Sequence, residues 1–154
     1  MTYTTSQVAH VALVTPRQLQ WWDEEGILSP VQSERKRRYE PRELFAVMLF
    51  RELRERKFSM KVVRRVWKLM QKQRFDMPCE GKKYLLTNGE RVVFLEQDNV
   101  VLAFLLQRRS PPYYLISLVD VQERMNEQLA IVARRGPVSA RVSQPVTSPQ
   151  ERAG

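Results

Sequence analysis

The sequence predicts a mainly α protein with a small α+β C-terminal part, and three observations lead to this fold class. The segment from Thr15 has a cap residue, a proline at the first helical position and a glutamine at capping-box spacing. Apolar residues recur at helical spacing after Pro41 and again after Ser59. Beyond Gln73 the pattern becomes that of short strands, with the hairpin signal Asn88-Gly89 between two of them.

The first two predicted helices form a helix-turn-helix. A first helix is expected to start at Thr5 with the sequence SQVAHVA, and residues 12–14 can turn the chain into the helix that follows Thr15. In that second helix Leu19 and Trp22 lie three apart and share the buried face, whereas Trp21 lies either in the core or outside it. The polar, planar side chains that point elsewhere suit a DNA groove; they are Arg17, Gln18 and Gln20.

Three further elements complete the N-terminal half. The segment SPVQSERKRRYE is interpreted as a loop with some extended structure, because it is polar and has no hydrophobic period. A helix is expected from Pro41, and Ser59 is expected to cap a fourth helix with Trp67 on its apolar face. The basic residues on the other face of that helix, Lys61 among them, either are solvated or contact phosphates.

The C-terminal half is expected to be a short meander followed by one helix. The residues 83–87 and 91–96 flank Asn88-Gly89, whose two residues are expected to form the turn with positive φ at both positions. The residues 100–107 form an apolar run that predicts a strand covered on both faces, and residues 113–118 predict another strand. The last helix, residues 119–135, is expected to end at Gly136.

One face of this last helix carries an apolar stripe, made of Val121, Met125, Leu129 and Val132. The stripe covers either its own sheet or a partner helix. The predicted organisation is therefore a DNA-binding domain over residues 1–75, a dimerisation or regulatory module over residues 76–135 and a disordered tail over residues 136–154.

Charge is concentrated in the first half. Residues 1–75 contain 16 Lys and Arg against 8 Asp and Glu, a net charge of +8, whereas residues 76–135 contain 8 of each. Lys and Arg set against phosphates release condensed counterions, so this distribution favours a nucleic acid as the partner of the N-terminal half.

The sequence lacks the residues that several other classes of protein require. One cysteine, Cys79, and one histidine, His10, are too few for an intramolecular disulfide or a zinc site of soft ligands, so no metal and no cofactor is expected. No nucleophile, base and orienting residue occur together, which argues against an enzyme and leaves no catalytic residues to name. No secretory signal or spanning segment is visible, so a cytoplasmic, nucleoid-associated protein without a membrane partner is expected.

The N-terminal half resembles the MerR-type regulators, whose DNA-binding domain is a winged helix-turn-helix. The resemblance covers about residues 2–73 and rests on several motifs in order. They are Tyr3-Thr4, Ala9, VTPRQLQWWDEEGIL from Val14 to Leu28, Pro30, RRY at Arg37 to Tyr39, and KFS at Lys57 to Ser59. In this family the segment before Tyr39 is a basic wing, and the protein is a homodimer on a two-fold related site. Activation in the family comes from distorting a promoter for RNA polymerase.

Several positions depart from the family pattern. Leu13 stands where the family usually has a glycine, Gln20 replaces an arginine, and Trp21-Trp22 replaces Tyr-Tyr. Glutamine can still contact adenine and an indole can still reach a phosphate, so DNA binding is retained while base preference can shift. The single cysteine excludes the metal-sensing and iron–sulfur branches.

The expected function is a sequence-specific regulator of transcription that binds double-stranded DNA, as a homodimer and with RNA polymerase or a regulatory protein as a further partner. An alternative is an architectural, excisionase-like DNA-binding protein, or an adaptor whose C-terminal module docks a protein. Tyr39 either packs the wing or touches a phosphate. The expected DNA-binding residues are Thr15, Arg17, Gln18, Gln20, Trp21, Arg35, Lys36, Arg37, Arg38, Tyr39, Lys57 and Lys61.

Overall fold

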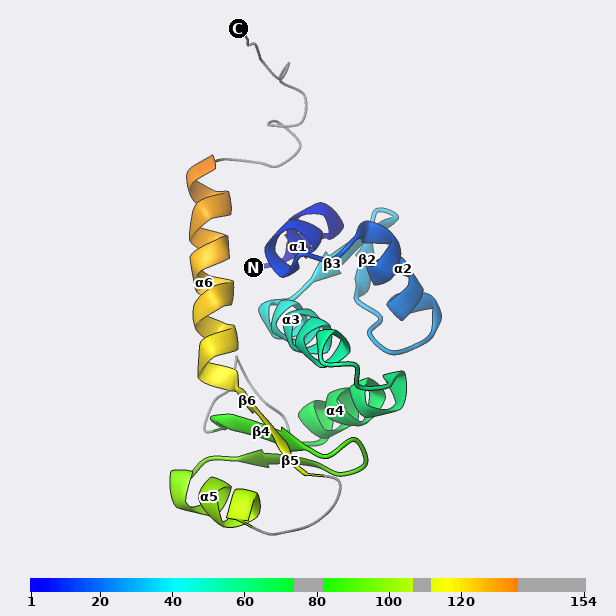
Figure 1. Cartoon of the computed structure of the whole chain (residues 1–154). Coiled ribbons are helices and arrows are strands. Elements are labelled where there is room, and N and C mark those ends of the chain that lie inside the picture. Colours follow the sequence, from blue (N-terminus) through cyan, green and yellow to red (C-terminus); the bar gives the residue numbers. More distant parts are fainter. Residues whose placement is uncertain (74–81, 107–111, 136–154) are drawn as a thin grey trace, which may run out of the picture.

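A computed structural model describes residues 1–73, 82–106 and 112–135 of the chain. It confirms a mainly helical protein with two small antiparallel sheets (Figure 1). The elements in order are β1 (Tyr3–Thr4), α1 (Thr5–Ala12), α2 (Pro16–Glu24), β2 (Val31–Ser33), β3 (Lys36–Tyr39), α3 (Pro41–Glu55), α4 (Met60–Lys72), β4 (Tyr84–Thr87), β5 (Val92–Leu95), α5 (Asp98–Leu106), β6 (Tyr114–Ser117) and α6 (Leu118–Arg135).

The helix-turn-helix forms as its sequence predicts. Thr4 caps α1 with Gln7, and Thr15 caps α2 with Gln18, each in a complete capping box. Between the two helices Leu13 adopts a left-handed conformation with φ of 57°. A leucine in this region costs about 1–2 kcal/mol relative to glycine, so this turn is strained.

The wing, expected as a loop with some extended structure, is a β-hairpin: the extended structure is present, and the loop is limited to a tight turn. Strands β2 and β3 pair antiparallel, β1 adds to the other edge of β3, and Ser33 opposite Lys36 leaves a two-residue turn. Both turn residues, Glu34 and Arg35, have positive φ, at 53° and 66°. Such a turn is usually made by Asn-Gly, so its charged residues gave no hairpin signal.

The core of the N-terminal half is built on α3. The ring of Phe50 stands edge-on between Trp22 of α2 and Trp67 of α4, with centroid separations of 5.6 and 6.1 Å. Edge-to-face contacts of this kind add to the burial of the rings themselves. They hold α2 and α4 against α3 through one shared ring.

The C-terminal half contains the predicted hairpin and one element of the wrong type. Thr87 pairs with Val92, so the hairpin loop has four residues, and of the predicted turn pair only Gly89 has positive φ. The residues 100–107 were expected to form a strand, but α5 runs to Leu106. A short apolar run has no period that separates a strand from a helix, and the leucines and alanine of this run favour the helix.

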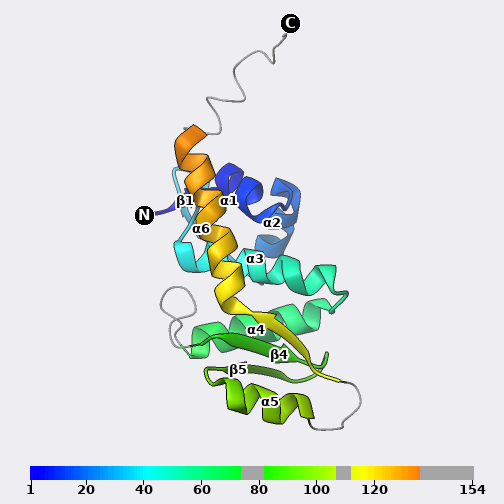
Figure 2. The same cartoon turned by 60° about the vertical axis from the view of Figure 1, so that its left-hand side comes forward.

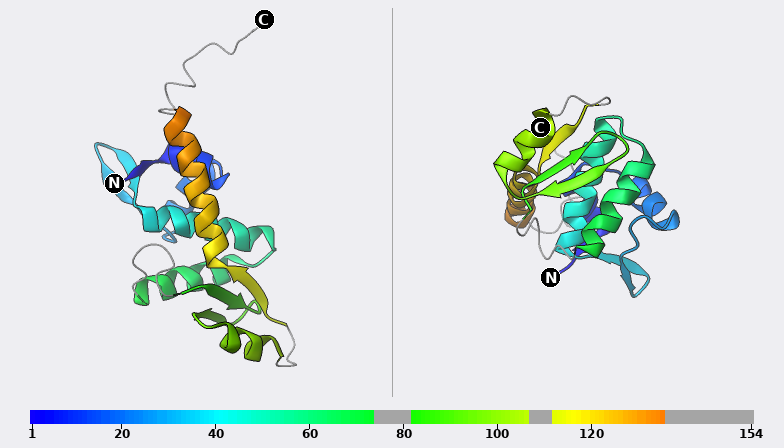
Figure 3. Two further views of the ribbon diagram at one scale, coloured as in Figure 1. Left: turned by 90° about the vertical axis from the view of Figure 1, so that its left-hand side faces the viewer. Right: turned by 90° about the horizontal axis from the view of Figure 1, so that it is seen from below.

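The terminal helix α6 packs across the N-terminal half. It contacts α1 and α3 as well as β4, and Figures 2 and 3 show it lying along α1 and α3. Its residues Val121, Met125 and Val132 belong to one apolar cluster that also includes residues of the helix-turn-helix. The stripe was expected to cover either its own sheet or a partner helix. The helix does contact β4 of its own sheet, but it packs mainly against α1 and α3 of the same chain, which was not expected. The boundary at residue 75, the helix end at Gly136 and the tail lie outside the described residues.

Candidate nucleic-acid interface

The outer face of α2 is the first part of the candidate interface. Leu19 and Trp22 are buried on the inner face, while Trp21 remains 42% exposed. Arg17 and Gln20 lie on the solvent side of the helix, as the spacing predicts, and of the two positions left open for Trp21 the structure shows the outer one. This face combines a cation, an amide and an indole, which can all donate hydrogen bonds to base edges or phosphates.

Two predicted residues of α2 also hold the helix in place. The Gln18 amide nitrogen of the backbone donates to Thr15 Oγ1 at 3.0 Å, and the Thr15 backbone nitrogen donates to Gln18 Oε1 at 2.8 Å. Each side-chain oxygen therefore satisfies a helix-end donor. Their structural contribution is to begin α2 at the correct point.

Glu24 lies beside the outer face of α2, and it was not among the expected DNA-binding residues. It lies one turn after Gln20, whose Nε2 donates to Glu24 Oε2 at 3.1 Å. The bond leaves the oxygen and the second N–H of the Gln20 amide for other partners. Its signal in the sequence is the i, i+4 spacing of the two residues.

The wing contributes exposed cations at its tip, Arg35 and Lys36. Arg37 turns to α2 instead, where its Nε donates to Asp23 Oδ2 at 2.6 Å. This hydrogen bond raises the pKa of the guanidinium, and the Arg37 and Asp23 side chains are only 27% and 16% exposed. Arg37 thus fastens the wing to α2, and Arg38 beside it is half-buried.

Tyr39 lies in the core and is fully buried. Burial raises the pKa of its hydroxyl to about 12, since ionisation would place a charge in an apolar environment. Of the two roles expected for this residue, the structure places it in packing of the wing, and its hydroxyl is not exposed to a phosphate.

The remaining predicted cations are Lys57, in the loop between α3 and α4, and Lys61, in the first turn of α4, and both are exposed. Lys57 has a positive φ of 69°. Arg54 closes the loop from α3, because its Nη1 donates to the carbonyl oxygen of Phe58 at 2.7 Å. The conformation that presents the lysines is therefore held by the end of α3.

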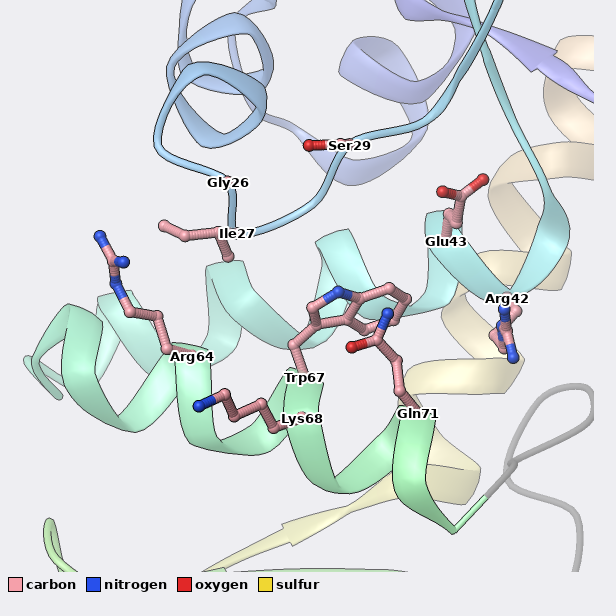
Figure 4. Close-up of a pocket in the computed structure, with 9 residues that line it drawn as sticks. All are labelled: Gly26, Ile27, Ser29, Arg42, Glu43, Arg64, Trp67, Lys68 and Gln71. Carbon is pink, nitrogen blue, oxygen red and sulfur yellow. The ribbon is translucent and has the colours of Figure 1, made fainter.

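Two recesses border α2. One of about 430 Å³ lies between α2 and the C-terminal end of α3 and is lined by Leu13, Val14, Gln18, Trp21, Trp22, Arg51, Arg54, Glu55 and Met60. The other, of about 510 Å³, lies between the loop after α2 and helix α4. Figure 4 shows Arg64, Trp67, Lys68 and Gln71 reaching into it from α4, below Gly26 and Ile27. Arg64 pairs with Glu25 at 3.4 Å, which adds a surface link between α4 and the end of α2.

Within the described residues no group of histidine, cysteine, aspartate and glutamate side chains could hold a metal ion. None of the helices in those ranges has both the length and the apolar character required to cross a membrane.

Comparison with known families identifies the first half. Residues 3–69 match the family model described as "MerR HTH family regulatory protein", a span that ends within α4. A comparison with curated proteins gave no match. The match covers α1, α2, the wing, α3 and most of α4, which are the elements that carry the candidate interface.

Proposed function

We propose that the protein is a sequence-specific regulator of transcription that binds double-stranded DNA as a homodimer. The proposal rests on the match of residues 3–69 to the model of the MerR HTH regulatory family. At the family level a DNA-binding regulator follows from the match itself. The sequence specificity, the dimer and the partners are the additional parts of the proposal.

The observation that carries the proposal is the arrangement of α2 between two cationic loops. Its outer face presents Arg17, Gln20 and Trp21 to solvent. On the wing Arg35 and Lys36 are exposed. Lys57 on the α3–α4 loop and Lys61 in the first turn of α4 are also exposed. In helix-turn-helix proteins one helix usually contacts the bases in the major groove, and cations beside it contact the adjacent phosphates and so position that helix.

Each part of this surface has a distinct role in the proposal. Arg17 suits guanine and Gln20 suits adenine, because each side chain can make two hydrogen bonds to the major-groove edge of that base. The exposed cations of the two loops neutralise phosphates, and Trp21 donates its indole N–H to one. Asp23 and Arg37 keep the wing in register with α2.

RNA polymerase or a regulatory protein is the further partner in this proposal, and the cytoplasm with its nucleoid is the location. An architectural DNA-binding protein would use the same surface without strong base preference. Selection of bound duplexes from a random pool separates the two, since a regulator yields one two-fold related site and an architectural protein yields many weakly related sites.

The direct test measures affinity for the selected duplex as a function of salt concentration. Replacing Arg35 and Lys36 with alanine is expected to weaken binding to every duplex and to reduce the salt slope by about one to two. The matched control replaces Lys83 and Arg91, two exposed cations of the C-terminal half. An equal loss in both double variants would show that binding follows net charge alone and would overturn the proposed interface.

A further inference from the structure

Helix α4 and strand β5 border a recess that the candidate nucleic-acid interface does not use. It has a volume of about 430 Å³, and Figures 1 and 2 show α2 and β5 on different sides of α4. We call the residues that line this recess the α4–β5 surface. They are Arg65, Lys68, Leu69, Lys72, Arg91 and Val92.

The cations of the α4–β5 surface form a compact positive group. On α4, Arg65, Lys68 and Lys72 lie at i, i+3 and i+7, which places them along one side of the helix over about 10 Å. Arg91 comes from the other element, directly before β5. All four side chains are exposed, no acidic residue lines the recess, and none of the four forms a salt bridge within the described ranges. Like charges at these spacings repel one another, so a bound anion stabilises the group.

The floor between these cations is apolar. Leu69 of α4 and Val92 of β5 are half-buried and pack against the main apolar cluster. Arg65 donates a hydrogen bond to the carbonyl oxygen of Glu90, which joins α4 to the hairpin loop before β5. The surface therefore combines a fixed apolar floor with positive charge around it.

We propose that the α4–β5 surface binds an acidic segment of a partner protein. Carboxylates of the segment pair with the four cations, and an apolar side chain between them covers Leu69 and Val92. Arg91 can hold a carboxylate through two parallel hydrogen bonds, and Arg65 has further N–H groups beyond the one that Glu90 accepts. The inference deepens the proposed function, on which it rests for its role, by giving the protein partner of the regulator a binding surface.

Phosphates of a nucleic acid are the other anions that such cations attract. Lys61 lies one turn before Arg65, so the row of cations on α4 begins beside the candidate nucleic-acid interface. The apolar floor favours a protein segment, because a leucine-like side chain buries apolar area on Leu69 and Val92 and a phosphate does not. The position of β5 on a different side of α4 from α2 also allows DNA and the segment to bind together.

Titration of the full chain with a synthetic peptide tests the proposal. In this probe pairs of glutamates alternate with leucines, and the wild type is expected to bind it at low salt with a Kd of about 0.1 mM, since exposed ion pairs are individually weak. The variant with Lys72→Glu and Arg91→Glu is expected to bind the peptide at least about tenfold more weakly, because two attractive contacts become repulsive. Its affinity for the selected duplex is expected to stay at the wild-type value, which also shows that the variant is folded.

The matched control makes the same change of charge on the wing. The variant with Arg35→Glu and Lys36→Glu is expected to lose affinity for the duplex and to keep the wild-type affinity for the peptide. Changes in the probe separate the two parts of the recognition. A peptide with serine in place of leucine is expected to bind the wild type about fivefold more weakly. A peptide with lysine in place of glutamate is expected to bind only the Lys72→Glu and Arg91→Glu variant, a gain that a misfolded chain would not show.

A wild type that binds no acidic peptide up to about 1 mM overturns the proposal. Equal peptide affinity in the wild type and the Lys72→Glu and Arg91→Glu variant overturns it too, as does equal affinity for the leucine and serine peptides. Displacement of the peptide by the duplex, together with a loss of duplex affinity in that variant, would assign the α4–β5 surface to nucleic acid instead. A chain that binds the peptide as expected but binds no duplex would refute the proposed function alone.

Discussion

Replacing Asp23 with alanine shows whether this residue affects DNA binding through its charge or through its hydrogen bond to Arg37. On charge alone, the loss of a carboxylate beside DNA strengthens binding. Asp23 also accepts the hydrogen bond of Arg37, through which the wing is joined to α2. We therefore expect the variant to bind DNA more weakly, which is the opposite sign.

The size of the effect follows from the exposure of the pair. A hydrogen bond to a charged group contributes about 1.5–3 kcal/mol, whereas an exposed ion pair contributes about 0.2–1 kcal/mol. Arg37 and Asp23 are 27% and 16% exposed, so solvent screens part of the interaction and about 1–2 kcal/mol remains. For a protein of this size the Tm is expected to fall by about 2–8 °C.

The assay combines thermal unfolding with DNA titration. A loss of about 1 kcal/mol in binding, which is about fivefold, is expected for Asp23→Ala on any duplex. Glu24→Ala is the matched control, because Glu24 is an exposed acid on the same helix and has no bond to the wing. On a random duplex the control is expected to bind slightly more tightly. If Asp23→Ala behaved like this control and kept the wild-type Tm, the ion pair would not position the wing.

Four further outcomes are expected. Arg17→Ala and Gln20→Ala should each cost about 1–3 kcal/mol on the selected duplex and less on random DNA, and equal losses on both would make these residues phosphate contacts. Tyr39→Phe should leave DNA affinity unchanged in the same titration, because the hydroxyl is buried; a weaker complex would return this residue to the interface. Burial raises the pKa of Glu43 above its usual 4.5, so the folded state holds the proton more tightly than the unfolded state does. The protein therefore loses stability as the pH rises through the raised pKa. In denaturant titrations Glu43→Gln should lose less stability between pH 4.5 and 7 than the wild type does. A chain that ends at Gln73 should unfold at lower urea concentration than the whole protein, since α1 and α3 lose the cover of α6, and an unchanged midpoint would contradict that packing.

The elements that the sequence predicted well are those whose signals are local. The Thr15 capping box needs only residues within one turn, and it forms as expected. The burial of Trp22 and the exposure of Trp21 follow from helix geometry, which turns adjacent residues by 100°. The same geometry places Arg17 outward without any knowledge of the rest of the fold.

Turn chemistry was a weaker guide. The Asn88-Gly89 pair correctly marked a hairpin, but Asn88 accepts hydrogen bonds from the backbone of Glu90 and Arg91 and so supports a longer loop. The wing makes its tight turn with Glu34 and Arg35, where no residue favours positive φ. There the pairing of β3 with β1 and the link of Arg37 to Asp23 of α2 hold the hairpin, and these are contacts distant in sequence.

Partners of an apolar face are the least local property of all. The spacing of Val121, Met125 and Val132 identifies a stripe, but it is silent on which of several surfaces the stripe covers. In the structure these residues join the cluster that contains Leu44 and Leu49 of α3, so the C-terminal half stabilises the DNA-binding half directly. Since α3 in turn supports α2 through the contact of Phe50 with Trp22, α6 stabilises through α3 the helix that carries Arg17 and Gln20.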